Sequence, residues 1–390
     1  GSEGKLISEL SDGTTRALSG AQETLSMVRP EDDAFMPWTG LLLGAPILGF
    51  YFWANNQFMV QRVLGAKDIN HGRWGALFAG FLKLPVLFFM VLPGTAAILI
   101  YSNMDMSFMN YQLPGGEICK NLRECPNATY PLLLFDLLPK GILGLVLAGL
   151  LAAMMSSVSA TFNSASTLVT MDFIQKFRPG MSSQQLVRAG QITTLVLVLL
   201  ACAWAPMIEK FDSLWEYLQK VLSYIAPPVA ATFILGLFWR RANGTGSIAA
   251  LGTGFVTAIV MVIAGVTATA AAEAGETAPA WAEYLNGIHF LHFTFALFIA
   301  CLIVNLVVSL MTPEPSETFQ RTASVDDVER LGGKVKAGDL ITDQLENYVW
   351  KKSLFTDETE ELKDMPWYLN YRYLSIILLI ITAILIGNFW

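Results

Sequence analysis

Long apolar runs separated by polar segments dominate the chain. A membrane-spanning helix needs about 20 mainly apolar residues. Eight segments reach that length, at about 37–65, 72–101, 139–174, 185–207, 213–239, 245–268, 288–311 and 368–390. A backbone in lipid must satisfy its own hydrogen bonds, so segments of this length are expected to be helices. The pattern predicts an all-α, multi-pass membrane protein.

The polar segments divide the chain into four predicted regions. Residues 1–36 are predicted to be an extracellular loop segment, 37–311 the transmembrane core, 312–367 a cytoplasmic polar loop, and 368–390 the final helix. Lys and Arg gather in the loops after the first, third, fifth and seventh spans, whereas the loop at 268–287 has neither. Because basic loops stay in the cytoplasm, both chain ends are placed outside.

Composition supports the membrane reading. The chain is 54% hydrophobic and 15% charged, whereas a soluble domain carries roughly 25% charged residues. The net charge is −7, and the basic residues do not cluster into a face for nucleic acid. We therefore expect a lipid bilayer and no nucleic acid as partner. The chain starts Gly-Ser-Glu-Gly without Met, which we interpret as sequence missing upstream.

Four cysteines are too few for a disulfide scaffold. Cys119 and Cys125 share one polar loop, so a local disulfide is predicted if that loop faces an oxidising compartment.

Ala153, Ser156 and Ser157 lie three and four residues apart within the third span and therefore share one helical face. Sodium is a hard cation that prefers oxygen ligands. Two hydroxyls and the Ala153 carbonyl could supply them. Spacing alone favours another interpretation, in which small residues let two membrane helices pack closely.

Lys83 lies near the middle of the second span in a run otherwise free of charge. A central lysine costs about 2.5–3.5 kcal/mol on insertion scales. The alternative, snorkelling to the interface, reaches only near helix ends. Lys83 is therefore predicted to face a cavity or a partner.

Gln219 precedes Pro227 and Pro228 within the fifth span. The proline pair is predicted to interrupt the helix and free backbone carbonyls, a feature found where a helix lines a cavity. The Gln219 amide suits a pair of sugar hydroxyls. A hydrogen bond between helices is the alternative.

The first span carries a cluster of aromatic and amide side chains. Aromatic faces pack on a pyranose ring and amides read its hydroxyls, whereas an aromatic belt or core packing is an equally good reading of this composition. The cluster comprises Tyr51, Phe52, Trp53, Asn55, Asn56 and Gln57.

Three sequence runs together resemble the sodium/solute symporter family, nearest its sodium–glucose cotransporter branch. They are FYFWANNQFMVQRVLGAKDINHGRWGALFAGFLKLPVLFFMVLPG at 50–94, YPLLLFDLLPKGILGLVLAGLLAAMMSSVSATFNSASTLVTMDF at 130–173, and YLQKVLSYIAPPVAATFILGLFWRR at 217–241. Within the second, MSSVSATFNSASTLVTMD is the most specific part. The resemblance implies the inverted-repeat leucine-transporter fold, with ligands bound at mid-membrane between broken helices. It also implies that the N-terminal repeat is largely missing here.

The resemblance assigns roles to the candidate residues. Ala153, Ser156 and Ser157 match the family's sodium site, which reverses the preference for packing. Lys83 aligns with a lysine lining the sugar cavity, and Gln219 with a principal sugar contact. The triplet at 51–53 matches the inner gate below the sugar.

Three positions in the first span depart from the family pattern. Phe52 stands where close relatives have tyrosine, and Asn56 replaces an aspartate common in animal transporters. Gly49 stands where a side-chain contact is often found. These departures leave the identity of the sugar open.

The resemblance implies sodium-coupled symport of a sugar or polyol, glucose-like or galactose-like, into the cell by alternating access. Na⁺ is the co-transported ion, no organic cofactor is expected, and the protein is not expected to be an enzyme. The expected location is the plasma membrane, or the inner membrane of a bacterium. The alternatives are symport of myo-inositol, sialic acid, proline or choline, a membrane sensor, and a truncated chain without transport of its own.

Overall fold

The computed structural model describes most of the helical part of the chain. The described residues are 7–9, 15–17, 26, 28–33, 36–101, 118–120, 126–178, 180–208, 214–239, 241–274, 276–313, 362 and 365–388. The predicted disulfide partner Cys125 and nearly all of the predicted 312–367 loop lie outside this set.

Seven helical segments in the described part of the chain are long and apolar enough to cross a membrane. They are Ile69–Ala97, Lys140–Phe177, Ser183–Pro206, Tyr217–Phe238, Gly244–Ala271, Phe290–Met311 and Tyr371–Asn388. The all-α membrane fold class is confirmed, and each of these segments corresponds to one predicted span.

Short irregular pieces interrupt several of the long helices. The α-helices are α2 (Trp38–Leu43), α3 (Ala45–Phe50), α4 (Gln57–Leu64), α5 (Ile69–Lys83), α6 (Leu92–Ile100), α7 (Thr129–Leu137), α8 (Lys140–Leu168), α9 (Gln175–Phe177), α10 (Ser183–Ile208), α11 (Leu214–Phe238), α12 (Gly244–Glu273), α13 (Ala280–Asn286), α14 (Phe290–Met311) and α18 (Tyr371–Asn388). Three π-helical turns, η1 (Tyr51–Asn55), η2 (Leu87–Val91) and η5 (Val169–Ile174), and one 3₁₀ turn, η4 (Pro126–Ala128), join them.

The predicted first span, 37–65, is not one continuous helix. It is divided into α2, α3, the π-helical η1 and α4, and Asn56 between η1 and α4 has extended backbone angles of φ −71° and ψ 113°. The Asn56 Oδ1 atom accepts a hydrogen bond of 3.2 Å from the Phe58 backbone N–H. Asparagine favours such caps because its side chain competes with helical backbone bonds. The apolar run therefore forms a broken helix.

The segments predicted as loops also contain regular structure. Strands β1 (Ile7–Glu9) and β2 (Thr15–Ala17) form an antiparallel pair within the segment predicted as an extracellular loop. Helix α7 follows within the predicted 102–138 loop, and α13 lies between α12 and α14.

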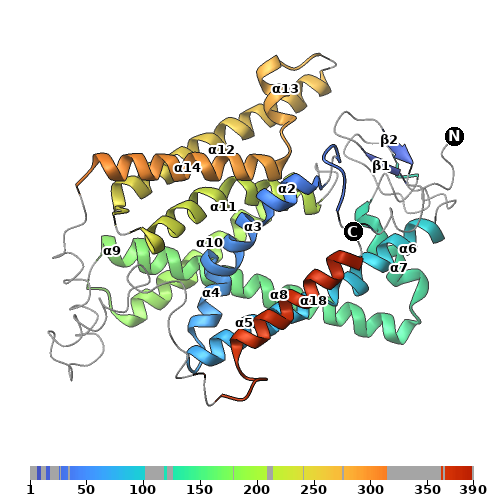
Figure 1. The fold of residues 1–390 in the computed structure, drawn as a ribbon, viewed down its shortest axis with the longest axis horizontal. Coiled ribbons are helices and arrows are strands. Elements are labelled where there is room, and N and C mark those ends of the chain that lie inside the picture. Colours follow the sequence, from blue (N-terminus) through green and yellow to red (C-terminus); the bar gives the residue numbers. More distant parts are fainter. Residues whose placement is uncertain are drawn as a thin grey trace.

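Helices α11, α12 and α14 lie side by side and enclose the largest buried apolar cluster of the described residues (Figure 1). Gly254 of α12 lies against Pro228 of α11, where an added Cβ would be 2.5 Å from the proline Cγ. Helix α11 continues through Pro227 and Pro228, so the predicted interruption at this pair is wrong. The prolines instead face a tightly packed neighbour, which supports the helix where their missing N–H groups weaken it.

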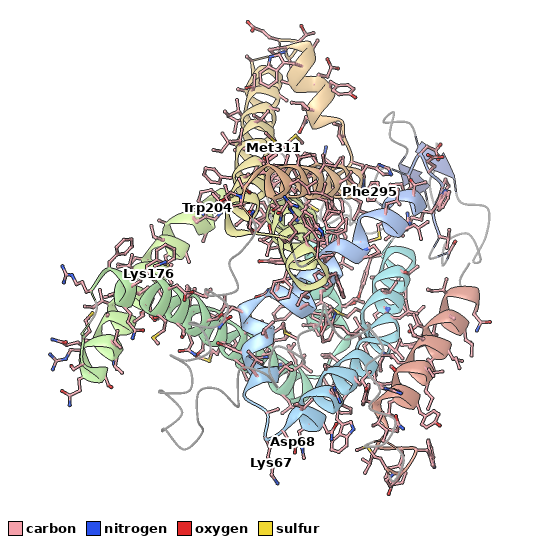
Figure 2. All side chains as sticks on the ribbon, turned by 60° about the vertical axis from the view of Figure 1, so that its left-hand side comes forward. Lys67, Asp68, Lys176, Trp204, Phe295 and Met311 are labelled. Carbon is pink, nitrogen blue, oxygen red and sulfur yellow. The ribbon has the colours of Figure 1, made fainter. Side chains whose placement is uncertain are left out.

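Helix α18 packs along α5 (Figure 1). The Trp74 indole Nε1 donates a 2.6 Å hydrogen bond to the Leu369 carbonyl, just before α18. The Arg73 guanidinium lies 4.5 Å from the centre of the Tyr371 ring. The turn into α5, marked by Lys67 and Asp68 (Figure 2), is fixed by the Asp68 carboxylate, which accepts a 2.9 Å bond from the His71 backbone N–H.

Candidate functional site

The broken helix lies between two helical groups. Its α2 and α3 pieces contact α14, its α3 and η1 pieces contact α11, and α4 contacts α8 (Figure 1). The aromatic triplet lies on η1, directly before the break at Asn56. Broken helices at membrane depth are tolerated where they are enclosed by protein or line a cavity. The break therefore marks the centre of the candidate site.

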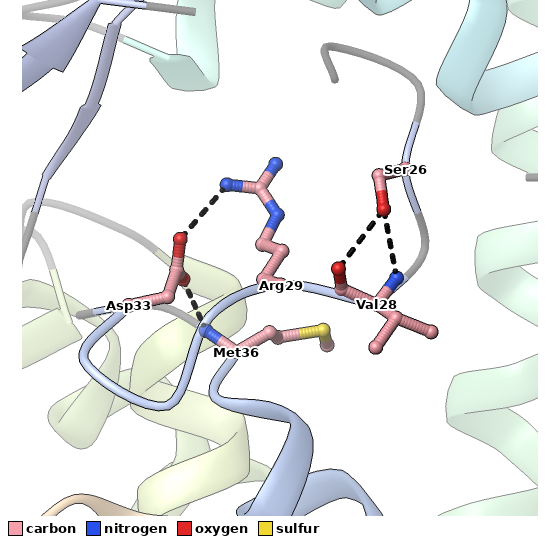
Figure 3. A network of polar contacts seen from close by, with 5 residues as sticks. All are labelled: Ser26, Val28, Arg29, Asp33 and Met36. Atoms are coloured by element: carbon pink, nitrogen blue, oxygen red, sulfur yellow. Dashed lines mark hydrogen bonds and ion pairs between the residues drawn. The ribbon is translucent and has the colours of Figure 1, made fainter. Parts of the chain in front are cut away.

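The chain that leads into the broken helix is held by a small polar network (Figure 3). The buried Asp33 carboxylate forms a 3.3 Å ion pair with Arg29 through Oδ2, and its Oδ1 accepts a 2.8 Å bond from the Met36 backbone N–H. The Ser26 hydroxyl bridges the backbone N–H and C=O of Val28. This network fixes the direction in which the chain enters α2.

Two glycines set the distance between the broken helix and α14. An added Cβ on Gly40 would lie 2.8 Å from the Leu291 Cβ, and one on Gly44 would overlap the Leu291 carbonyl oxygen. The Thr39 hydroxyl and the His292 Nε2 atom form a 2.8 Å hydrogen bond across the same interface. Small residues at spacing i, i+4 let membrane helices approach closely, so α14 anchors the first part of the broken helix.

Tyr51 packs toward α11. It contacts a buried cluster that contains Ala226 of α11 and Phe290 of α14, and Leu222 borders the same cluster. Gln219 lies three residues before Leu222 and seven before Ala226, so it falls on the same face of α11. Gln219 is half-buried. The structure thus places Gln219 and Tyr51 on the two elements that face each other.

Lys83 meets the middle residue of the triplet. Its Nζ atom lies 5.8 Å from the centre of the Phe52 ring, within the range of a cation–π contact. Phe52 also contacts Trp53 edge-on, with ring centres 5.8 Å apart. Lys83 is the last residue of α5, and Leu84 and Pro85 form a turn before η2. The contact therefore joins the end of α5 to the broken helix.

The three sodium candidates lie on α8. Ala153, Ser156 and Ser157 are all exposed in the described part of the chain. The Ser157 carbonyl accepts a 2.9 Å bond from the Thr161 hydroxyl. No hydrogen bond joins these three residues to the aromatic triplet within the described residues.

Close packing of α8 occurs farther along the helix. Ser164 and Ser166 are buried, and the Ser166 hydroxyl donates a 2.7 Å bond to the Gly190 carbonyl of α10. The helix-packing role considered for the serines of α8 thus belongs to this later pair. Ser156 and Ser157, in contrast, are exposed in the described structure.

The amide residues of the cluster have different surroundings. Asn56 caps α4, and Gln57 is the half-buried first residue of that helix. Asn55 was predicted only as one member of the aromatic and amide cluster, and the structure distinguishes it from the other amides: both polar atoms of its side chain are buried without a hydrogen-bond partner among the described residues.

Cys119 is disulfide-bonded, whereas Cys202 and Cys301 are free. Cys119 is buried with Ala97, Tyr101 and residues of α7. Its predicted partner, Cys125, lies outside the described residues.

Comparison with known families identifies the family of the chain. Residues 6–254 match the family model described as "Sodium:solute symporter family". The chain belongs to this family. The match begins before the broken helix and ends within α12, so it includes Lys83, Gln219 and the three α8 residues.

Relatives of the chain are sodium cotransporters. It is 33% identical to the sodium/myo-inositol cotransporter of Homo sapiens over 322 residues, which cover 82% of this chain and 44% of the relative. It is 36% identical to the sodium/mannose cotransporter of Bos taurus over 300 residues, 75% of this chain and 49% of the relative. It is 35% identical to the sodium/glucose cotransporter 1 of Mus musculus over 280 residues, which cover 71% of this chain and 41% of the relative. The chain thus spans less than half the length of these symporters.

Proposed function

We propose that the protein containing this chain is a sodium-coupled symporter of a sugar or polyol in the plasma membrane. The observation that carries the proposal is the contact between Lys83 and Phe52 at the break in the helix. A charged donor and an aromatic face meet at Phe52, and the Gln219 amide lies on α11, the helix that η1 contacts. Such a set of groups suits a solute with an apolar ring face and several hydroxyls. The named solutes of the relatives, myo-inositol, mannose and glucose, are all of this chemical class.

Sodium enters the proposal as a co-transported substrate. Ala153 would provide its carbonyl oxygen, whose second lone pair stays free in a helix, and Ser156 and Ser157 would provide hydroxyls. The exposed face of α8 supports this role, because ligands from another part of the full protein can reach it. Residues outside this chain would complete the coordination.

Coupling follows from differential binding of the two substrates. Sodium can favour one conformation only by binding it more tightly than the other. The solute must then raise the sodium affinity by the same factor by which sodium raises the solute affinity, typically about 5–150-fold. No covalent chemistry is part of this cycle, so the protein would be a transporter and not an enzyme.

The proposal is tested by uptake into proteoliposomes that contain the full-length protein. Labelled glucose, galactose, mannose and myo-inositol are offered with an inward sodium gradient and with a matched potassium gradient. We expect uptake of at least one of them only with sodium. Equal uptake in both gradients would contradict coupling, and uptake of only proline, choline or sialic acid would move the substrate outside the sugar and polyol class.

A further inference from the structure

The side chain of Asn55 has no hydrogen-bond partner in the described part of the chain. Its Oδ1 and Nδ2 atoms are both sealed from solvent. Asn55 ends the π-helical turn η1 and directly precedes the extended residue Asn56. A buried amide without partners costs free energy, so native proteins rarely keep one without a reason. We therefore expect the Asn55 amide to gain a hydrogen-bond partner at some stage of the protein's function.

The surroundings of Asn55 are those of the candidate site. Asn55 follows Tyr51 by four residues, which in a π-helical turn places it nearly below the tyrosine, on the face that packs toward α11. The same turn carries Phe52, which contacts Lys83. Single π-helical turns within α-helices are found frequently at functional sites. Asn55 thus lies one turn from the proposed solute contacts.

A second unpartnered polar group lies on the neighbouring helix. The Thr232 hydroxyl of α11 is buried and has no hydrogen-bond partner among the described residues. The ring of Phe233, the next residue, lies 6.5 Å from that of Phe50, the residue before η1. Helix α11 therefore also carries an unsatisfied buried hydroxyl, next to a residue that contacts the end of α3.

We propose that Asn55 is a further solute-binding residue, which exchanges hydrogen bonds with a hydroxyl of the transported sugar or polyol at the break in the helix. This inference rests on the proposed function. A solute hydroxyl can donate a hydrogen bond to Oδ1 and can accept one from Nδ2. One hydroxyl of the solute can therefore serve as partner for either polar atom of the Asn55 amide. A lone ordered water is the competing partner, and it would make the role purely structural.

The experiment uses the full-length protein in proteoliposomes and compares the wild type with Asn55→Leu. Uptake is measured for the transported sugar and for a set of analogues that each lack one hydroxyl. For the wild type, we expect one deoxy analogue to have a KM about tenfold higher than the parent sugar. For Asn55→Leu, we expect the parent sugar and that analogue to have equal KM values, with half-saturation by sodium unchanged.

Asn305→Leu is the matched control. Asn305 of α14 is fully buried, and its Nδ2 atom has no partner among the described residues. It lies in the contact between α14 and the start of α12, where its Oδ1 accepts a bond from Ser309. We expect Asn305→Leu to lower the Tm and to leave the preference among analogues unchanged.

Thermal unfolding in detergent gives a readout that does not depend on transport. If Asn55 binds solute, Asn55→Leu keeps or raises the Tm of the solute-free protein and reduces the increase in Tm that the sugar causes. A lower solute-free Tm with an undiminished sugar-induced increase shows a structural water only and overturns the inference. Equal changes of KM for the parent sugar and for every analogue in Asn55→Leu would also overturn the inference. Absence of sodium-dependent uptake by the wild type itself overturns the proposed function, and the inference with it.

Discussion

The Nζ atom of Lys83 lies 5.8 Å from the centre of the Phe52 ring. The two residues are 31 positions apart, on the last turn of α5 and on the π-helical turn of the broken helix. A cation near an aromatic face is stabilised by about 0.5–1 kcal/mol at exposed sites and by more where water is excluded. The ring therefore offers the lysine a partner in a membrane environment that would otherwise penalise its charge.

Replacing Lys83 by Ala is expected to weaken solute binding more than sodium binding. Loss of a charged donor to a solute hydroxyl costs about 1.5 kcal/mol or more, which corresponds to a rise in solute KM of at least about tenfold. Half-saturation by sodium should change much less. Lys176→Ala on α9 is the matched control (Figure 2), and an unchanged solute KM in Lys83→Ala would remove the lysine from the site.

The ring contact is tested by two substitutions of Phe52. Phe52→Leu removes the aromatic face, so we expect the solute KM to rise about two- to fivefold, as the loss of a cation–π contact predicts. Phe52→Tyr keeps the ring and should stay close to the wild-type value. Equal effects of both substitutions would indicate that the volume of the side chain matters and the ring does not.

Ser157→Ala is expected to raise the sodium concentration for half-maximal uptake. Removal of one oxygen ligand that contributes about 1.4 kcal/mol corresponds to a tenfold change. Ser166→Ala is the control on the same helix, because its hydroxyl bonds to the Gly190 carbonyl of α10. It should lower thermal stability and leave the sodium dependence unchanged. A sodium dependence altered only in Ser166→Ala would reverse these roles.

The sequence was sufficient to predict most spans because hydropathy alone decides which segments enter a bilayer. It could not show the break at Asn56, since the apolar run continues on both sides and the decisive event is one side-chain cap on the Phe58 N–H. At Pro227 and Pro228 the error is the opposite one, because a break was predicted where the helix is continuous. Local rules predict an interruption there, but tertiary packing against Gly254 keeps α11 continuous.

The candidate site was only partly visible in the sequence for a related reason. Residue types and a family pattern indicated Lys83 and the aromatic triplet separately. Their contact depends on how the end of α5 lies beside the broken helix, which no local pattern encodes. The unsatisfied amide of Asn55 likewise depends on burial by neighbouring elements.

Gly44→Ala is expected to displace the broken helix from α14. An added Cβ would overlap the Leu291 carbonyl oxygen, which belongs to the backbone and cannot rotate away. Overpacking of this kind typically costs about 1–3 kcal/mol, so the Tm in detergent should fall. Gly49→Ala in α3 is the matched control, because no atom lies within 4 Å of its added Cβ. A Tm lowered equally by both substitutions would exclude the close approach as the cause.

Tyr101, which follows α6, is expected to ionise only at high pH. Its hydroxyl donates a 2.6 Å hydrogen bond to Asp136, and this bond, together with burial and the carboxylate charge, raises the pKa of Tyr101 to about 12. Since the folded state has the higher pKa, the stabilisation is fully present below the ordinary tyrosine pKa of about 10 and is lost as the pH rises toward 12. Tyrosinate absorbance, taken as the difference between wild type and Tyr101→Phe, measures this titration. Asp136→Asn should move it back toward pH 10, and a transition near pH 10 in the wild type would show that the hydrogen bond does not hold the proton.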